Sequence, residues 1–322
     1  MFAVILAYLV FVTVPAGSDL SSSGFQVSLL EENDGLGSHG FMAPVSDNYY
    51  TQGEAVRLRL QISPVSRLTG GIRQLIYSPN NVNTTDLAEF RGDQPYAGWL
   101  FLFAGLERQA GPWTFGGELD AGVIGPAAEG GAAQTAFHQF IRWAEKANGP
   151  PRPGGLGVYE VANAPGFDVV LSAEREFLRL TRENAAGKGF GIFKGSTPEF
   201  NLFSTSKVEL GTVYGRGRFG AGFHAGFFGL PAPVPFEMFL TAQAELLGIA
   251  WDRLLQGRLL RGVQNETGLR NFSQAVNFGI KGRYRRLGFF TGQTIQKQDL
   301  VSLPPGVELW HRYGQLEISA FW

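Results

Sequence analysis

The chain has 322 residues, no cysteine and a formal net charge of −1. The near-neutral charge argues against a nucleic-acid-binding protein, and the missing cysteine excludes disulfides and thiolate metal sites. Charged residues make up 17%, aromatic residues 13%, and glycine occurs 44 times. A soluble globular enzyme is compatible with these values, but a membrane β-barrel fits better, because its strands alternate apolar and polar residues.

The first 18 residues resemble a secretory signal. The apolar run Phe2–Val14 is followed by small residues at Ala16, Gly17 and Ser18, as at a cleavage site. We expect residues 1–18 to be a signal-peptide-like segment and residues 19–322 to form one barrel domain. No later stretch approaches 18 consecutive apolar residues, so the sequence predicts no membrane-spanning helix.

Alternation with a period of two predicts strands in the first half of the chain. The clearest is Glu54–Ser63, where Val56 to Ile62 contributes an aliphatic row at even positions and Arg57 and Arg59 lie on the other face. Inward arginines suit a polar barrel lumen, with the aliphatic row facing lipid. In a soluble sandwich the same row would face a core. The other expected strands here are Gly24–Asp34, Gly70–Tyr77, Gly98–Leu106 and Trp113–Val123.

The second half also alternates, and it ends with apolar residues at every second position and an aromatic terminus, Trp322. This ending is typical of the closing strand of bacterial outer-membrane barrels. About twelve strands over the mature length give ~25 residues per strand and loop, in keeping with such barrels. We therefore expect an all-β, transmembrane antiparallel barrel of about twelve strands. The expected segments are Phe167–Leu180, Ser206–Tyr214, Phe219–Phe228, Glu237–Ile249, Arg253–Val263, Gln274–Arg285, Leu287–Ile295 and Glu308–Trp322.

One stretch, Gly131–Lys146, is expected to be a helix rather than a strand. Gln134 and His138 are four positions apart and Glu145 is seven beyond His138, so the three share one helical face. Strands of an outer-membrane barrel run alternately outward and inward, with the N-terminus in the periplasm and the long loops outside. The helix therefore lies at the outer rim.

The same topology brings further polar residues to that rim. Asn33 and Asp34 lie at the outer end of the first strand, and Thr51 lies at the outer start of the second. An imidazole, a carboxylate, amides and a hydroxyl from separate segments are what a hydrolytic site requires.

At these residues the chain resembles the lipid A 3'-O-deacylase family of outer-membrane barrels. The resemblance covers residues 33–146, in order, and the later part of the chain matches only as barrel strands. The matching pieces are Asn33-Asp34, Tyr50-Thr51-x-Gly53, Ile76-Tyr77-Ser78-Pro79, Gly92-Asp93, Pro95-Tyr96-Ala97-Gly98-Trp99, Gly122-Val123-Ile124-Gly125-Pro126 and Gln134-x-x-x-His138.

The resemblance implies a carboxylic ester hydrolase that depends on Ca²⁺ and removes an ester-linked 3'-acyl chain from lipid A of lipopolysaccharide in the bacterial outer membrane. His138 would be the general base that activates water, a role that suits imidazole near neutral pH. Asp34 would help to hold Ca²⁺, with Glu145 as a further acidic group. Asn33, Thr51 and Gln134 would position water, metal or substrate.

Substrate contacts are expected from Tyr50, Arg91 and Asp93. The chain departs from the family where members can carry a basic pair after the Ser-Pro, because Thr84 and Thr85 stand there. A basic pair would suit lipid A phosphates. Arg91 is the nearest remaining cation, so phosphate recognition is expected to differ.

Other interpretations of these residues stay open. The chain could be an outer-membrane esterase or phospholipase acting on another acylated lipid, a porin or structural barrel without catalysis, or a soluble β-sandwich. His138 and Glu145 could be solvated helix residues. Tyr96 and Trp99 are expected at the membrane boundary rather than at a substrate. The GxGxxG match at residues 215–220 lacks the helix of a nucleotide site and is interpreted as a turn between strands.

Overall fold

The computed structural model describes residues 24–34, 36, 49–79, 94–136, 160–181, 197–228, 236–256, 268–301 and 309–322. The signal-like segment therefore lies outside the described residues. The same holds for four predicted site residues, Arg91, Asp93, His138 and Glu145, and for Thr84 and Thr85.

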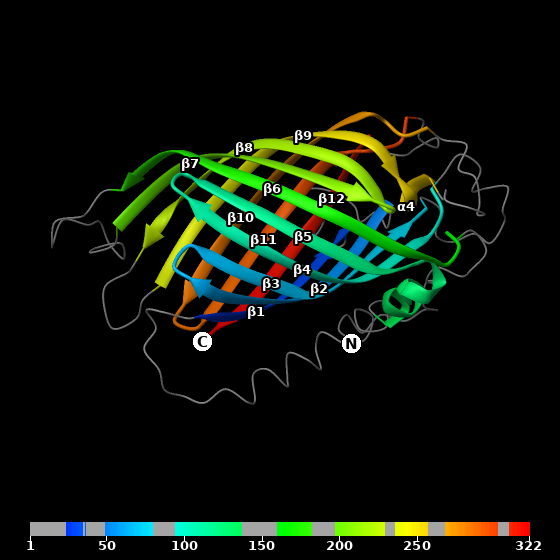
Figure 1. Ribbon diagram of the computed structural model, residues 1–322. Coiled ribbons are helices and arrows are strands. Elements are labelled where there is room, and N and C mark those ends of the chain that lie inside the picture. The colour runs from blue at the N-terminus through cyan, green and yellow to red at the C-terminus, as the bar shows by residue number, and fades with distance from the viewer. Residues whose placement is uncertain are drawn as a thin grey trace, which may run out of the picture.

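The described part of the chain forms twelve antiparallel strands that close into one barrel (Figure 1). Each strand pairs with its neighbours in sequence, and β1 pairs with β12. The closed antiparallel barrel predicted from the sequence is thus confirmed. Its elements are β1 (Phe25–Asn33), β2 (Tyr49–Ser63), β3 (Ser66–Ser78), β4 (Ala97–Ala110), β5 (Trp113–Ile124), η2 (Pro126–Ala128), β6 (Ala164–Thr181), β7 (Thr197–Gly211), β8 (Tyr214–Phe228), β9 (Phe236–Asp252), α4 (Arg253–Gln256), β10 (Phe272–Tyr284), β11 (Leu287–Lys297) and β12 (Trp310–Phe321).

The two faces of the barrel wall differ in polarity. Leu58 and Leu102 point outward and are 44% and 64% exposed, as expected of side chains that meet lipid. Arg59 lines an internal cavity of about 910 Å³, and the guanidinium of Arg57 lies over the ring of the buried Phe103. The inward arginines and the outward aliphatic row of β2 are therefore confirmed. Among the described residues, no helix is long and apolar enough to cross a membrane.

The two rims of the barrel also differ. One rim carries the tight turns at residues 64–65, 111–112 and 285–286, and we call it the turn rim. β1 ends and β2 begins at the opposite rim, which also receives the long connection between β5 and β6. We call this second rim the site rim, because the described candidate residues lie there.

Aromatic side chains cross the lumen near the site rim. The hydroxyl oxygens of Tyr77 and Tyr214 are 3.1 Å apart, although their strands, β3 and β8, are not neighbours in the sheet. Trp99 is 1% exposed and stacks on Phe101, with ring centroids 4.0 Å apart. The expectation that Trp99 faces the membrane boundary is therefore wrong. Because Leu102 points outward, the odd-numbered residues of β4 point into the lumen.

Two further expectations are corrected. The segment Arg253–Val263 does not begin as a strand, because residues 253–256 form α4. Asp252 Oδ1 accepts hydrogen bonds from the backbone N–H groups of Leu254 and Leu255, at 3.0 and 3.2 Å, which is the N-cap interaction that starts a helix. Residues 215–220 lie within β8 rather than in a turn.

The polarity of the wall predicts the effect of a charge on its outer face. Leu102→Arg is expected to lower the free energy of unfolding by about 2–4 kcal/mol, because an arginine near the middle of the lipid-facing band loses hydration. Ala110→Arg, outward on the same strand but beside the turn rim, is expected to cost no more than about 1 kcal/mol. Urea unfolding in lipid vesicles measures both. Equal losses of unfolding free energy at positions 102 and 110 would contradict the placement of Leu102 near the middle of the lipid-facing band.

Candidate functional site

Four of the predicted site residues lie together at the site rim. Asn33 ends β1, Asp34 follows it, Thr51 lies near the start of β2, and Gln134 lies in the helix of residues 130–136. Their side chains are buried, with exposed fractions between 2% and 5%. Tyr50, a predicted substrate contact, is one of the residues that line the internal cavity.

The alternation of side-chain directions along β1 determines on which face of the barrel wall Asn33 lies. Glu32 lines the internal cavity. Asn33 is the next residue of the same strand, and successive side chains point to opposite faces. Asn33 is the register partner of Gln52 on β2, and Gln52 donates a hydrogen bond to Glu31, which shares the parity of Asn33. Asn33 and Gln52 therefore lie on the outward face of the barrel rather than in its lumen.

Thr51 occupies an irregular position in β2. Tyr50 pairs with Tyr77 and Gln52 pairs with Ile76, so the register of β2 against β3 shifts across Thr51. Such a bulge inserts one extra residue and redirects side chains, and bulges are common beside active sites. Here it lets Tyr50 point into the lumen while Gln52 contacts outward-facing residues.

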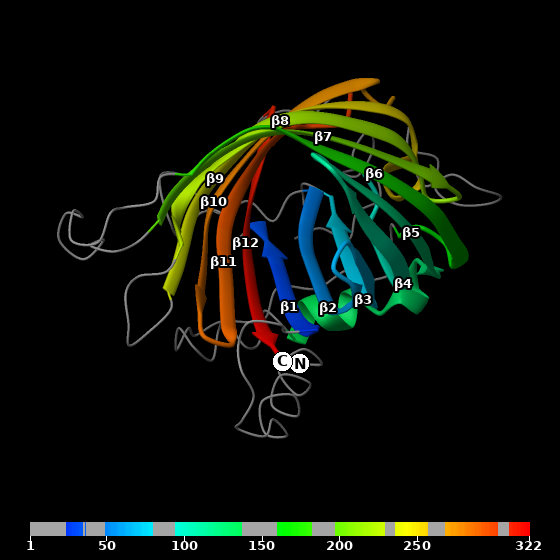
Figure 2. The ribbon, with the colours of Figure 1, turned by 60° about the vertical axis from the view of Figure 1, so that its left-hand side comes forward.

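The helix of residues 130–136 packs on the outside of the wall. Figure 2 shows it outside the barrel beside the ends of the neighbouring strands. Gln74 Nε2 donates a hydrogen bond of 2.5 Å to the Ala128 carbonyl. A Cβ at Gly98 would lie 3.0 Å from Ala128 Cβ, so glycine permits this close approach. Gln134 Nε2 lies 3.4 Å from Ser78 Oγ, which brings the predicted site helix against the end of β3.

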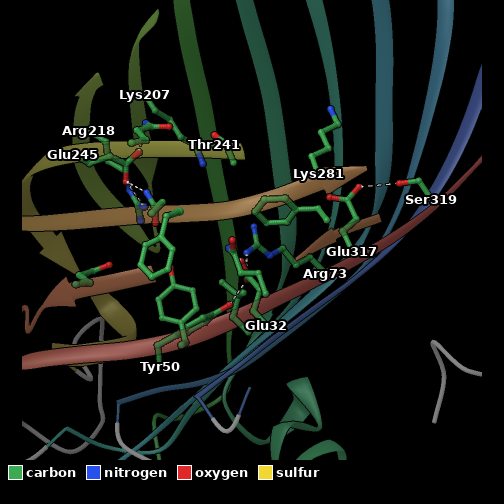
Figure 3. Close-up of a pocket in the computed structure, with 18 of the residues that line it drawn as sticks. Glu32, Tyr50, Arg73, Lys207, Arg218, Thr241, Glu245, Lys281, Glu317 and Ser319 are labelled. Carbon is green, nitrogen blue, oxygen red and sulfur yellow. Dashed lines mark hydrogen bonds and ion pairs between the residues drawn. The ribbon is translucent and has the colours of Figure 1, made fainter. Parts of the chain in front are cut away.

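A lumenal network supports the strands behind the site. Glu32 accepts hydrogen bonds from the Tyr50 hydroxyl, from Arg73 Nη2 at 2.6 Å and from Gln315 Nε2 at 2.6 Å. Figure 3 shows Glu32, Tyr50 and Arg73 directed toward one another inside the barrel. His311 Nε2 lies 2.9 Å from the Tyr50 carbonyl oxygen. The network therefore joins β1, β2, β3 and β12.

This network holds the residues that directly precede the site. Glu32 precedes Asn33, and Tyr50 precedes Thr51, so the contact between Glu32 and Tyr50 fixes both segments from the lumen. No role was predicted for Glu32 from the sequence. The residue in the sequence that reflects the contact of Tyr50 with Glu32 is Gly53. A Cβ at this position would overlap the Tyr50 hydroxyl and lie 2.8 Å from Glu32 Oε2.

The donor atoms near Asp34 suit a hard cation. Among the described residues, no group of three or more histidine, cysteine, aspartate or glutamate side chains could hold a metal ion. At the same rim, Asp34 offers a carboxylate, Asn33 an amide oxygen and Thr51 a hydroxyl, and all three side chains are buried. Oxygen donors of this kind fit Ca²⁺. The described set is incomplete by itself, so further ligands would have to come from elsewhere.

The lumenal network predicts the effect of filling the space at Gly53. Gly53→Ala is expected to lower the free energy of unfolding by about 1–3 kcal/mol, because it separates Tyr50 from the buried Glu32 carboxylate. In a Tyr50→Phe background, which lacks the overlapping hydroxyl, the same change is expected to cost less. Urea unfolding of the four chains tests this coupling. Equal costs in the two backgrounds would contradict it.

Comparison with known proteins agrees with this geometry. The family model described as "Outer membrane protein LpxR" matches residues 2–322. The solved structure of LpxR from Salmonella typhimurium is similar, with a TM-score of 0.72 and 16% sequence identity, covering 92% of this chain and 100% of that chain. An outer membrane channel from Pseudomonas putida F1 has a TM-score of 0.39 and 11% identity, covering 96% of this chain and 100% of that one. No curated protein matches significantly. Because the family model spans nearly the whole sequence, the chain belongs to the LpxR family of outer membrane proteins.

Proposed function

We propose that this protein is a lipid A deacylase, an ester hydrolase that removes a 3'-acyl chain from lipid A in the outer leaflet, with the site rim outside the cell. One observation carries the proposal. Asn33, Asp34, Thr51 and Gln134 come from three separate segments and are all buried at the site rim, where Gln134 lies 3.4 Å from Ser78 at the end of β3. A lipid lying beside the barrel reaches that rim without entering the lumen.

In this proposal His138 is the general base. It lies four residues after Gln134, so a helix that continues past residue 136 carries both on one face. Neutral imidazole accepts a proton from water as the water attacks the ester carbonyl carbon. Asn33, Thr51 and Gln134 hold water and substrate in place, and orientation of this kind supplies part of the rate.

Asp34 and Glu145 are the proposed ligands for Ca²⁺, with amide and hydroxyl oxygens beside them. When bound, the ion would polarise the ester carbonyl and stabilise the charge that develops on its oxygen. The residues of the chain orient this group and exclude bulk water, which strengthens the electrostatic interactions within the site.

The barrel interior supports an enzyme over a porin. The contact between Tyr77 and Tyr214 crosses the lumen, and ion pairs such as Arg59–Glu317, at 3.8 Å, occupy it further down. An open pore needs an unobstructed aqueous path. An esterase acting on another acylated lipid is the second candidate, because Thr84 and Thr85 replace the basic pair found in family members.

The first functional prediction concerns His138. Cells that express the intact chain are expected to contain lipid A lighter by one acyl or acyloxyacyl unit, and cells that express His138→Ala are expected to contain unchanged lipid A. The reason is that the variant lacks the proton acceptor. Mass spectrometry of extracted lipid A measures the difference. His224→Gln is a matched control, because His224 stacks on Phe203 in the lumen, away from the site rim.

Two outcomes would contradict this assignment. Full deacylation by His138→Ala would exclude the histidine as the base. Unchanged lipid A with the intact chain, folded in the outer membrane with Ca²⁺ present, would exclude lipid A as the substrate. Phospholipids would then be tested with the same pair of variants.

The second functional prediction concerns the metal. Excess EGTA is expected to abolish hydrolysis by the purified enzyme, and added Ca²⁺ is expected to restore it. Asp34→Asn is expected to raise the Ca²⁺ concentration needed for half-maximal rate by about tenfold or more, because the ion loses an anionic oxygen ligand. Initial rates against free Ca²⁺ measure both effects. Full activity in excess chelator would contradict a role for the ion.

A further inference from the structure

Two carboxylates lie side by side on the outward face, directly below the candidate site. Glu31 of β1 is the register partner of Glu54 of β2, and Glu54 is the partner of Gln74 of β3. This polar row runs across three strands. The next row toward the site rim contains Asn33 and its partner Gln52, so the carboxylates adjoin the site.

The position of this pair is unfavourable for two negative charges. On the same face, one step further from the site rim, Leu29 pairs with Val56, and beyond them the wall is aliphatic. Like charges directly opposite each other on neighbouring strands are destabilising. Ionisable groups on the lipid side of a membrane protein are costly and mark functional sites.

The outward pair also differs from the carboxylates inside the barrel. Glu32, Glu209 and Glu245 each form an ion pair with an arginine in the lumen. Among the described residues, no lysine, arginine or histidine forms an ion pair with Glu31 or Glu54. Within the described part of the chain, these three internal carboxylates have arginine partners, whereas the outward pair has no cationic side chain as a partner.

Gln52 gives a second, independent indication of a ligand. Its side chain is fully buried, and its Nε2 lies 2.7 Å from Glu54 Oε1 and 3.4 Å from Glu31 Oε1. Within the described part of the chain, its Oε1 has no hydrogen-bond partner. A buried carbonyl oxygen without a donor is costly. In the structure the amide nitrogen faces the carboxylates; with a cation bound, rotation of the amide would turn Oε1 toward them and add a third oxygen donor.

We propose that Glu31, Glu54 and Gln52 form a divalent-cation subsite that joins a phosphate of the lipid substrate to the barrel wall. Ions such as Mg²⁺ are commonly held by one or two carboxylates together with substrate phosphates and water. The subsite is separate from the ion assigned to Asp34, and it takes the place of the basic pair that Thr84 and Thr85 replace. Only the identity of its lipid partner rests on the proposed function.

The test counts bound ions in the purified, folded chain in detergent. Mn²⁺ serves as the probe, because it favours the same oxygen ligands and the free ion is measured by electron paramagnetic resonance. All chains carry Asp34→Asn, which weakens binding of the ion proposed for catalysis, so that any further change in Mn²⁺ binding is assigned to the added substitutions. Adding Glu31→Gln and Glu54→Gln is expected to remove one bound Mn²⁺ per chain or to weaken its binding about tenfold or more. Equal Mn²⁺ binding with and without the two substitutions would overturn the subsite.

A matched control changes two carboxylates inside the barrel instead. Glu209→Gln with Glu245→Gln, in the same Asp34→Asn background, is expected to leave Mn²⁺ binding unchanged. Heat-modifiable migration on gels verifies that every variant is folded. If the lumenal pair removed the ion and the outward pair did not, the assignment to the outer face would be wrong.

The phosphate partner is tested by adding lipid. Micelles that contain phosphatidic acid are expected to tighten Mn²⁺ binding about tenfold in the chain with Glu31 and Glu54, and micelles of a phosphate-free glycolipid are expected to leave it unchanged. Inorganic phosphate at the same concentration distinguishes a lipid headgroup from the free anion. An equal effect of both lipids would overturn the bridging role.

Failure of this proposal and failure of the proposed function are distinguishable. Mn²⁺ binding requires no turnover, so a chain that binds the ion at Glu31 and Glu54 but leaves lipid A intact would retain the subsite and lose the enzymatic assignment. If the intact chain deacylates lipid A but the variant with Glu31→Gln and Glu54→Gln binds as much Mn²⁺ as its parent, the enzymatic assignment would stand and the subsite would be wrong.

Discussion

Closure of the hydrogen-bonded wall is the constraint on which the rest of this structure depends. A membrane-spanning sheet satisfies its backbone groups only when no edge is left open, and the pairing of β1 with β12 meets that requirement. Once the wall is closed, each side chain on a strand faces either the lumen or the outside. Glu32 and Asn33 are neighbours in sequence, yet this rule sends Glu32 to the lumen and Asn33 to the outward face.

The wall thereby separates the buried network in the lumen from the candidate residues on the outward face. Inside, Glu32, Tyr50 and Arg73 form a buried network in which the ion pair is only 2.6 Å long. Outside, the helix of residues 130–136 rests on the strand ends and brings Gln134 to Ser78. The bulge at Thr51 links the two sides, because it permits Tyr50 to enter the lumen network while Gln52 turns outward. The lumenal network therefore supports, from inside the barrel, the two strand ends that carry Asn33 and Thr51.

The charge distribution follows the same division. Glu32, Glu209 and Glu245 in the lumen each have an arginine partner. The outward pair, Glu31 and Glu54, has Gln52 between its members and no cationic side chain from the described residues. A surface that meets a phosphorylated lipid would repel it with two bare carboxylates. A bridging divalent ion resolves that conflict, and for this reason the cation subsite is consistent with a phosphorylated lipid as the substrate.

The sequence by itself determined the barrel, its approximate strand count, the lipid-facing row of β2 and the rim that carries Asn33, Thr51 and Gln134. Local alternation and ordered family motifs carry that information. Trp99 and the segment from Arg253 were misassigned, because an aromatic residue suits a lumen as well as a membrane boundary, and the Asp252 cap has no strong pattern. Only the tertiary structure decided that Glu32 meets Tyr50, that Tyr77 meets Tyr214 and that Glu31 faces Glu54. These contacts depend on strand register and on the bulge at Thr51, which are set by pairing between separate strands rather than by any local signal.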